Sequence, residues 1–81
     1  KVYILSRQQK LHPTGSPMKL DYLIIHDNPK ISPEIVFKVF DTHLVIIDET
    51  NSFYSEKKWK NYCQQAKIDY YSISEKGSLS L

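Results

Sequence analysis

The stretch "LDYLIIHDNPKIS" at residues 20–32 decides the fold, because a short apolar run in it stops at a histidine and an aspartate. A run as short and as uniformly apolar as "YLII" is typical of a strand covered on both faces. Asn28-Pro29 then breaks the run and predicts a turn. His26 and Asp27, at the end of the strand, are candidates for binding a metal.

A helix start follows the turn directly, at Ser32-Pro33-Glu34. The Ser32 side chain is expected to cap free amides, Pro33 suits the first helical position, and Glu34 complements the helix dipole. The helix is predicted to end near Asp41. Its apolar face is formed by Ile35, Val36, Val39 and Phe40.

Further elements follow on both sides of this stretch. Strands are predicted at 1–6, 21–27, 42–48 and 69–74, with a turn at 75–77 and a last hairpin strand at 78–81. Residues 7–20 hold two prolines and a glycine and are predicted to be a loop, and a second helix is expected at about 55–66.

This β-β-α-β-α-β-β order predicts an α/β fold with a mostly parallel sheet, since strands separated by helices join through right-handed crossovers. Only the last hairpin strand would be antiparallel. If this chain stands alone, strand 1–6 would form an exposed sheet edge, and self-association through that edge or through an apolar face is then expected.

The composition limits the chain to one small domain, residues 1–81. A hydrophobic fraction of 41% and a charged fraction of 25% are ordinary for a globular protein and argue against disorder. The apolar runs fall far short of the about 18 residues of a membrane helix. The chain starts on a strand at Lys1 rather than on Met, so we expect a fragment of a larger protein.

Ligands of parallel α/β sheets bind beyond the carboxyl ends of the strands, where this sequence places Asp27, Asp48 and Glu49. These carboxylates are candidates for no more than a weak divalent-metal site, because water activation needs several converging ligands. A structural role is favoured, with Asp27 accepting amide hydrogen bonds in its turn. The sequence therefore predicts no catalytic residue and no cofactor.

Two other candidate sites have simpler explanations. Asp48, at the end of "LVIID", resembles the phosphorylated aspartate of a receiver domain, but no acidic pair or suitable lysine accompanies it. Cys63 lies on the same helix face as Trp59, and the helix carries no histidine that could activate its thiol. Core packing is therefore favoured over catalysis.

The run "KKWK" at 57–60 is the chain's densest group of positive charges. Lysines release counterions when they contact phosphates, and exposed aromatic rings such as Tyr54 or Tyr70 stack on bases. Two interpretations of this run are open: weak binding of single-stranded DNA, or a helix face that is simply exposed to solvent. The candidate contacts are Lys57, Lys58, Lys60 and Lys67.

Several segments resemble the C-terminal domain of ComEC-family competence proteins, particularly the Bacteroidetes-type members. They are "DYLIIHDNPKIS", "LVIIDETNS", "KKWKNYC" and "ISEKGSLSL", in the same order and spacing. The resemblance implies a metallo-β-lactamase-like fold, of which this chain would be the C-terminal half. It also implies a soluble, extracytoplasmic domain of an inner-membrane protein whose partners are the rest of its own polypeptide and single-stranded DNA.

This sequence departs from the family at its metal ligands. Better-preserved members carry His-His-Gly-Ser where this chain has His26-Asp27-Asn28-Pro29, and Thr-Gly-Asp where it has Ser6-Arg7-Gln8. "NSFYSE" replaces a Gly-His-Pro-His segment, and the N-terminal His-x-His-x-Asp-His cluster is absent. We therefore expect a non-catalytic part of a DNA-uptake protein. The alternative is part of a metal-dependent phosphodiesterase or nuclease whose other ligands lie outside these residues.

Overall fold

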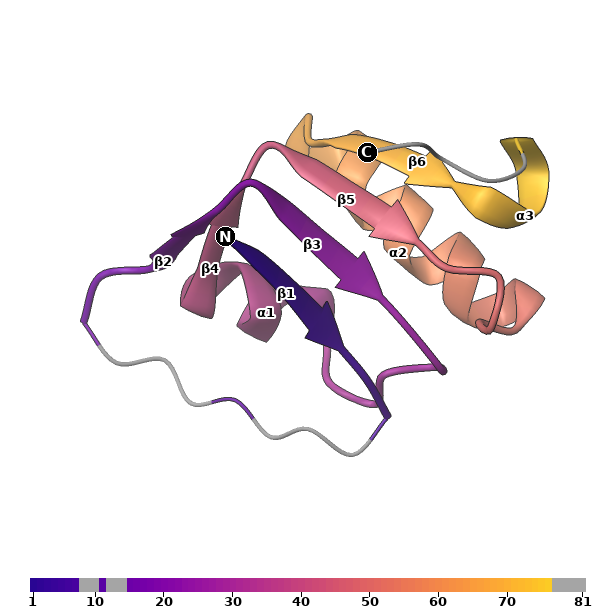
Figure 1. Cartoon of the computed structure of the whole chain (residues 1–81), viewed down its shortest axis with the longest axis horizontal. Helices are drawn as coiled ribbons and strands as arrows, with labels where there is room; N and C mark the ends of the chain where they lie inside the picture. Colours follow the sequence, from indigo (N-terminus) through magenta and orange to yellow (C-terminus); the bar gives the residue numbers. More distant parts are fainter. Residues whose placement is uncertain (8–10, 12–14, 77–81) are drawn as a thin grey trace.

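The computed structural model describes residues 1–7, 11 and 15–76. Its main sheet has four parallel strands in the order β1-β3-β5-β6 (Figure 1). The strands are β1 (Val2–Leu5), β3 (Tyr22–Ile25), β5 (Leu44–Ile47) and β6 (Asp69–Ser72). The predicted α/β class and mostly parallel sheet are thereby confirmed. The register sets Ile25 beside Ile47, and Ile47 beside Ser72.

A second, two-stranded sheet was missed by the sequence analysis. It pairs β2 (Met18–Leu20) with β4 (Phe40–Thr42) in parallel. The end of the predicted loop at 7–20 is therefore a strand. Three residues carry no periodic signal, and what fixes this pairing is the burial of Leu20, Phe40 and Thr42.

Three helices complete the described fold: α1 (Pro33–Val39), α2 (Phe53–Ala66) and α3 (Ile73–Lys76). Helix α1 starts at Pro33 as expected, although the Ser32 side chain makes no capping hydrogen bond. Helix α2 begins two residues earlier than predicted because Ser52 caps it, its hydroxyl accepting from the Ser55 amide at 3.2 Å.

The end of the described chain also differs from the prediction. Helix α3 occupies Glu75 and Lys76, where a turn was expected. This helix contacts β5 and β6. The predicted last strand at 78–81 lies outside the described residues.

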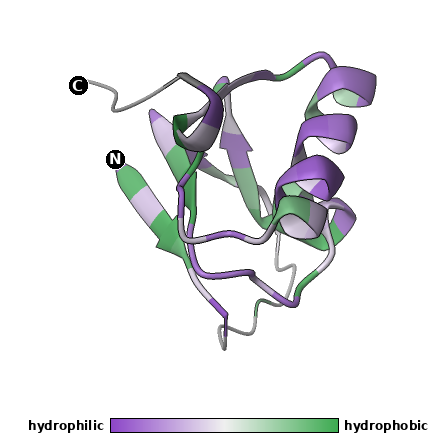
Figure 2. Cartoon of the chain, turned by 90° about the vertical axis from the view of Figure 1, so that its right-hand side faces the viewer, coloured by the Kyte–Doolittle hydropathy of each residue, from purple (hydrophilic) through white to green (hydrophobic). Residues whose placement is uncertain are grey.

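The core lies between one face of the main sheet and helices α1 and α2, which Figure 1 shows behind that sheet. Trp59 and Cys63 of α2 are fully buried there, as the sequence predicted. Figure 2 shows α2 with its hydrophilic side turned outward, and the hydrophobic strand β1 at the margin of the sheet. On the opposite sheet face, Val2 and Ile4 remain 52% and 56% exposed.

Candidate functional site

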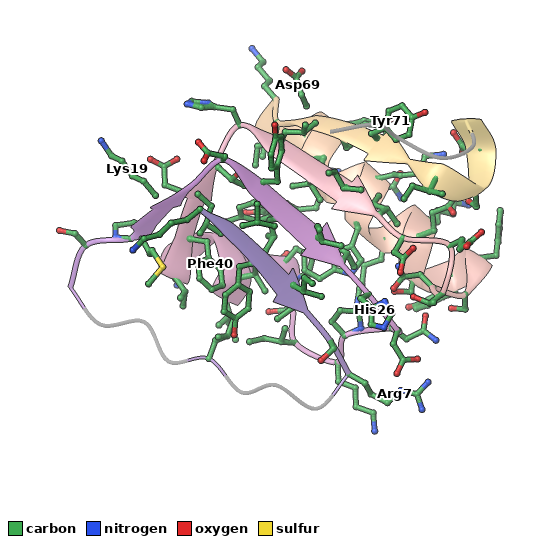
Figure 3. All side chains as sticks on the ribbon, viewed as in Figure 1. Arg7, Lys19, His26, Phe40, Asp69 and Tyr71 are labelled. Atoms are coloured by element: carbon green, nitrogen blue, oxygen red, sulfur yellow. The ribbon has the colours of Figure 1, made fainter. Side chains whose placement is uncertain are left out.

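Two neighbouring parallel strands bring a histidine and an aspartate together at the carboxyl end of the sheet. His26 follows β3 and Asp48 follows β5, and the His26 Nδ1 lies 2.6 Å from Asp48 Oδ2. Thr50 closes the group, its hydroxyl 3.1 Å from the same ring nitrogen and 3.2 Å from the same carboxylate oxygen. Figure 3 shows His26 and Arg7 at this end of the sheet.

Asp48 is held as an anion by its hydrogen bonds. Partial burial opposes its ionisation, but His26, the Glu49 amide and the Thr50 hydroxyl together hold the pKa of this carboxyl below its ordinary value. An ionised Asp48 can only accept, so the hydrogen bond runs from His26 Nδ1–H to Asp48 Oδ2 and leaves Nε2 as the ring nitrogen that faces away from the carboxylate. The pair is thus a histidine oriented by a carboxylate.

The turn after β3 is tied to the turn after β5 by side chains. Asp27 and Asn28 both have φ of 53°, a left-handed conformation that aspartate and asparagine tolerate. The Asp27 amide donates to Thr50 Oγ1 at 2.9 Å, and the Asn28 amide donates to Asn51 Oδ1 at 2.9 Å. Each turn therefore fixes the other.

Asn51 is the central residue of this connection. Its Nδ2 donates to the carbonyls of Ile25 and Asp48 at 2.8 and 2.7 Å, while its Oδ1 accepts from Asn28. The sequence analysis gave neither Asn51 nor Thr50 a structural role. The available signal was the presence of short polar side chains directly after both buried strands.

The three predicted metal candidates do not converge. Asp27 pairs with Arg7 at 3.3 Å, Asp48 pairs with His26, and Glu49 is exposed. Within the described residues, no group of three or more His, Cys, Asp or Glu side chains is placed to hold a metal ion. The described donors therefore do not make up a metal site by themselves.

A basic groove lies on the helical side of the molecule, with a volume of about 620 Å³. Lys57 and Lys58 of α2 line it together with Lys30, which comes from the segment before α1. Among its described lining residues Glu34 is the one acid. We call this the basic groove; its other lining residues are Ser32, Pro33, Tyr54, Asn61, Tyr62 and Gln65.

Aromatic side chains belong to the same groove. Tyr54 is 79% exposed, while Tyr62 is half-buried and stacks on Phe37 with ring centres 5.2 Å apart and an angle of 6°. Tyr70, the other tyrosine considered from sequence, instead accepts a hydrogen bond from Gln64 on a different part of the surface. Of the two tyrosines, Tyr54 is therefore the one whose exposed ring lies in the basic groove.

The four predicted DNA-contacting lysines separate into two groups. Lys57 and Lys58 line the basic groove, whereas Lys60 and Lys67 do not. Lys60 forms an ion pair with Glu75, and the hydrogen bond from this pair raises the pKa of Lys60. Lys67 ends α2 in a left-handed conformation. Lys30 joins the groove from a segment that no charge pattern singled out.

The whole chain, residues 1–81, matches the family model described as the ComEC C-terminal domain. The chain belongs to this ComEC family. Membership of this family indicates that the chain belongs to a competence protein that takes part in DNA uptake, and that this protein is a membrane protein. No curated protein and no solved structure gave a match.

In the part of this ComEC domain that the structure describes, no helix is long and apolar enough to cross a membrane. The half metallo-β-lactamase-like fold remains a prediction, because the structural comparison gave no match that tests it. In the resemblance noted from sequence, His26 and Asp27 take the place of the first two residues of His-His-Gly-Ser. That position carries the His26–Asp48 pair in this chain.

Proposed function

We propose that this domain serves DNA uptake without a catalytic centre of its own, by holding single-stranded DNA in the basic groove. One observation carries the proposal: Lys30, Lys57 and Lys58, from two separate segments, line the same groove as the exposed ring of Tyr54. Cations for the phosphates and a ring for a base are the two elements of single-strand binding.

The expected affinity is low and depends strongly on salt. Each phosphate neutralised on a single strand contributes about −0.7 to the slope of log K against log salt, so three lysines give a slope of about −2. Such a contact suits a strand that passes over the domain, because a strand held weakly is also released.

The non-catalytic part of the proposal rests on the polar network at the carboxyl end of the sheet. The two turns are joined by hydrogen bonds that involve the side chains of Asp48, Thr50 and Asn51 and the backbone amide of Asp27. The Asp27 carboxylate accepts from Arg7. A network of this kind is a sufficient reason for these side chains to be present. It requires neither a metal nor a substrate.

A metal-dependent phosphodiesterase or nuclease remains the second candidate because of one detail. A carboxylate on one ring nitrogen of a histidine is the usual support of a metal-binding histidine, and Asp48 gives His26 this support. The missing ligands would have to come from outside the described residues. Zn²⁺ that shifts the His26 ring signals at sub-millimolar concentration in NMR would favour this candidate.

Two further aspects belong to the same proposal. We place the domain on the extracytoplasmic side of the membrane, where incoming DNA arrives. The rest of the parent polypeptide is the proposed partner of the sheet face opposite the helices. Val2 and Ile4 are exposed on that face, which leaves apolar surface for packing.

Fluorescence anisotropy with a labelled oligothymidylate tests the groove directly. The double variant Lys57→Gln/Lys58→Gln should weaken binding about tenfold or more at low salt and reduce the salt slope to about −0.7. The matched control Lys38→Gln/Lys67→Gln removes the same charge outside the groove and should change the affinity little. Equal losses in both variants would mean that net charge, and not the groove, attracts DNA.

Tyr54→Ala separates stacking from charge. It should weaken binding of the single strand by about 1–3 kcal/mol while leaving the salt slope unchanged, because the ring carries no charge. Tyr70→Ala is the matched control, since that ring lies outside the groove. If Tyr54→Ala binds as tightly as the unchanged chain, the aromatic part of the proposal is wrong.

A further inference from the structure

The basic groove contains one carboxylate among its described lining residues, that of Glu34. This side chain is exposed and shares the groove with three lysines, Lys30, Lys57 and Lys58. Within residues 1–7, 11 and 15–76, no ion pair or hydrogen bond engages the Glu34 carboxylate. The groove therefore holds an acceptor whose two oxygens are open to a ligand.

The packing of α1 against α2 places Glu34 on one wall of the groove. Phe37, one turn further along α1, lies on the same side of that helix and stacks on Tyr62 of α2, with ring centres 5.2 Å apart. Tyr54, Lys58 and Tyr62 follow one another at a spacing of four residues and share one side of α2. Glu34 from one helix, and the exposed ring with a lysine from the other, therefore line the same groove.

A carboxylate in a groove that binds DNA distinguishes the parts of the strand by charge and by hydrogen bonding. Phosphates are anions that only accept hydrogen bonds, so Glu34 repels them while the lysines attract them. Base edges carry N–H donors, and in a single strand the base-pairing edge is free to be read. Glu34 is therefore suited to contact a base edge and not the backbone.

The four bases differ in what they offer a carboxylate. Guanine presents two neighbouring donors, N1–H and the N2 amino group, which match the two oxygens of a carboxylate in a bidentate pair. Adenine and cytosine each present one amino donor beside a ring nitrogen that accepts. Thymine presents N3–H between two carbonyl oxygens, which repel an anion. A carboxylate is therefore expected to prefer guanine most and thymine least.

We propose that Glu34 reads the base held in the basic groove and gives this domain a preference for guanine in single-stranded DNA. The inference rests on the proposed function and deepens it, because the lysines hold the phosphates and the Tyr54 ring stacks on the base that Glu34 contacts. The two oxygens of Glu34 accept from N1–H and N2–H of guanine. A strand that meets the groove is then held longest where it carries this base.

Glu34 also has a structural role, because it occupies the first turn of α1, where an acid complements the helix dipole. That role concerns the stability of the helix and does not depend on the sequence of a bound strand. A preference among bases that changes with the side chain at this position is therefore a readout that the structural role would not move.

Fluorescence anisotropy at low salt tests the base reading with short oligothymidylates that carry thymine, guanine, adenine or cytosine at one central position. The guanine strand should bind about fivefold to tenfold more tightly than the all-thymine strand, which is the lower part of the range for a bidentate contact. Glu34→Gln removes a negative charge and should bind every strand somewhat more tightly. It should also lose the guanine preference in favour of adenine or cytosine, because its amide donates as well as accepts.

Two further variants separate the base reading from charge and from stability. Glu49→Gln is the matched control, since it removes the same charge from an exposed glutamate outside the groove, and it should keep the guanine preference. Glu34→Asp keeps the charge and the complement to the dipole but shortens the side chain by one methylene. It should reduce the guanine preference and leave the salt slope unchanged. Circular dichroism of each variant shows whether the fold is retained.

Failure of this inference and failure of the proposed function give different results. The inference alone would be overturned if the four strands bound equally, or a strand other than the guanine strand bound best, while Lys57→Gln/Lys58→Gln still weakened binding. Binding to none of the strands would overturn both. A guanine preference that persists in Glu34→Gln would assign the base reading to another residue and overturn the role of Glu34.

Discussion

The Nδ1 of His26 lies 2.6 Å from the Oδ2 of Asp48, so the ends of two neighbouring parallel strands are joined by a side-chain hydrogen bond. The pair occupies the edge of the sheet where α/β proteins bind their ligands. In this chain its partners are the Thr50 hydroxyl and the Glu49 amide, and the pair joins the turn after β3 to the turn after β5. Its first measurable consequence is therefore for stability.

Asp48→Asn should destabilise the fold, because an uncharged amide oxygen accepts the hydrogen bond from His26 Nδ1–H less strongly than a carboxylate oxygen does. Both side chains are partly exposed, so we expect a loss of about 1 kcal/mol in the free energy of unfolding. A double-mutant cycle in urea with His26→Gln measures the interaction energy. Additive effects of the two substitutions would show that the pair contributes nothing.

The same carboxylate predicts a dependence of stability on acid pH. The pKa of Asp48 is lower in the folded chain than its ordinary value of 3.8. Its contribution is therefore fully present above about pH 4 and is lost as the pH falls through the lower folded value. Asp48→Asn should flatten the acid limb of the stability curve, measured by urea unfolding at a series of pH values. Asp69→Asn, which removes an exposed carboxylate, should keep that limb, and a limb unchanged by Asp48→Asn would contradict the assignment.

Asn51→Ala should be the most destabilising of the turn substitutions. It removes two donated hydrogen bonds and one accepted bond and leaves the carbonyls of Ile25 and Asp48 without this donor. We expect a loss of about 2–3 kcal/mol in the free energy of unfolding. Asn61→Ala, on the exposed side of α2, is the control and should stay within about 0.5 kcal/mol. Similar losses in both variants would refute the structural role of Asn51.

Cys63 should be unreactive in the folded chain. It is fully buried on α2, and burial raises the pKa of its thiol to about 11. A disulfide reagent at neutral pH should therefore label it only as fast as the domain opens, and at once in denaturant. Rapid labelling without denaturant would show that Cys63 is accessible and that the α2 packing differs from the structure.

The parts of the fold that were predictable are those with strong local signals. "YLII" and "LVII" are buried strands because they are uniformly apolar, and Pro33 begins α1 because its geometry suits that position. The pairing of β2 with β4 gave no such signal. Its strands have three residues each, and their pairing depends on the burial of Leu20 and Phe40 after the chain has folded.

The candidate sites show the same division. The clustering of polar residues at the carboxyl ends of β3 and β5 followed from the topology, but their bonding did not. The sequence offered Asp27, Asp48 and Glu49 as weak metal candidates and favoured a structural role, but it did not show that Arg7 engages Asp27 or that His26 engages Asp48. The run "KKWK" indicated two of the three lysines of the basic groove, Lys57 and Lys58. Lys30 joins it only because the turn before α1 lies next to α2, and a charge pattern along the chain cannot show that proximity.

A two-dimensional NMR titration with a single-stranded oligonucleotide at low salt tests the central claim most directly. The account predicts localised, saturable shifts at Lys30, Tyr54, Lys57 and Lys58, which disappear as salt is raised. Signals of His26 and Asp48 should stay unchanged. Shifts confined to the carboxyl end of the sheet, or no localised shift at any concentration, would contradict the basic groove as the DNA-binding surface.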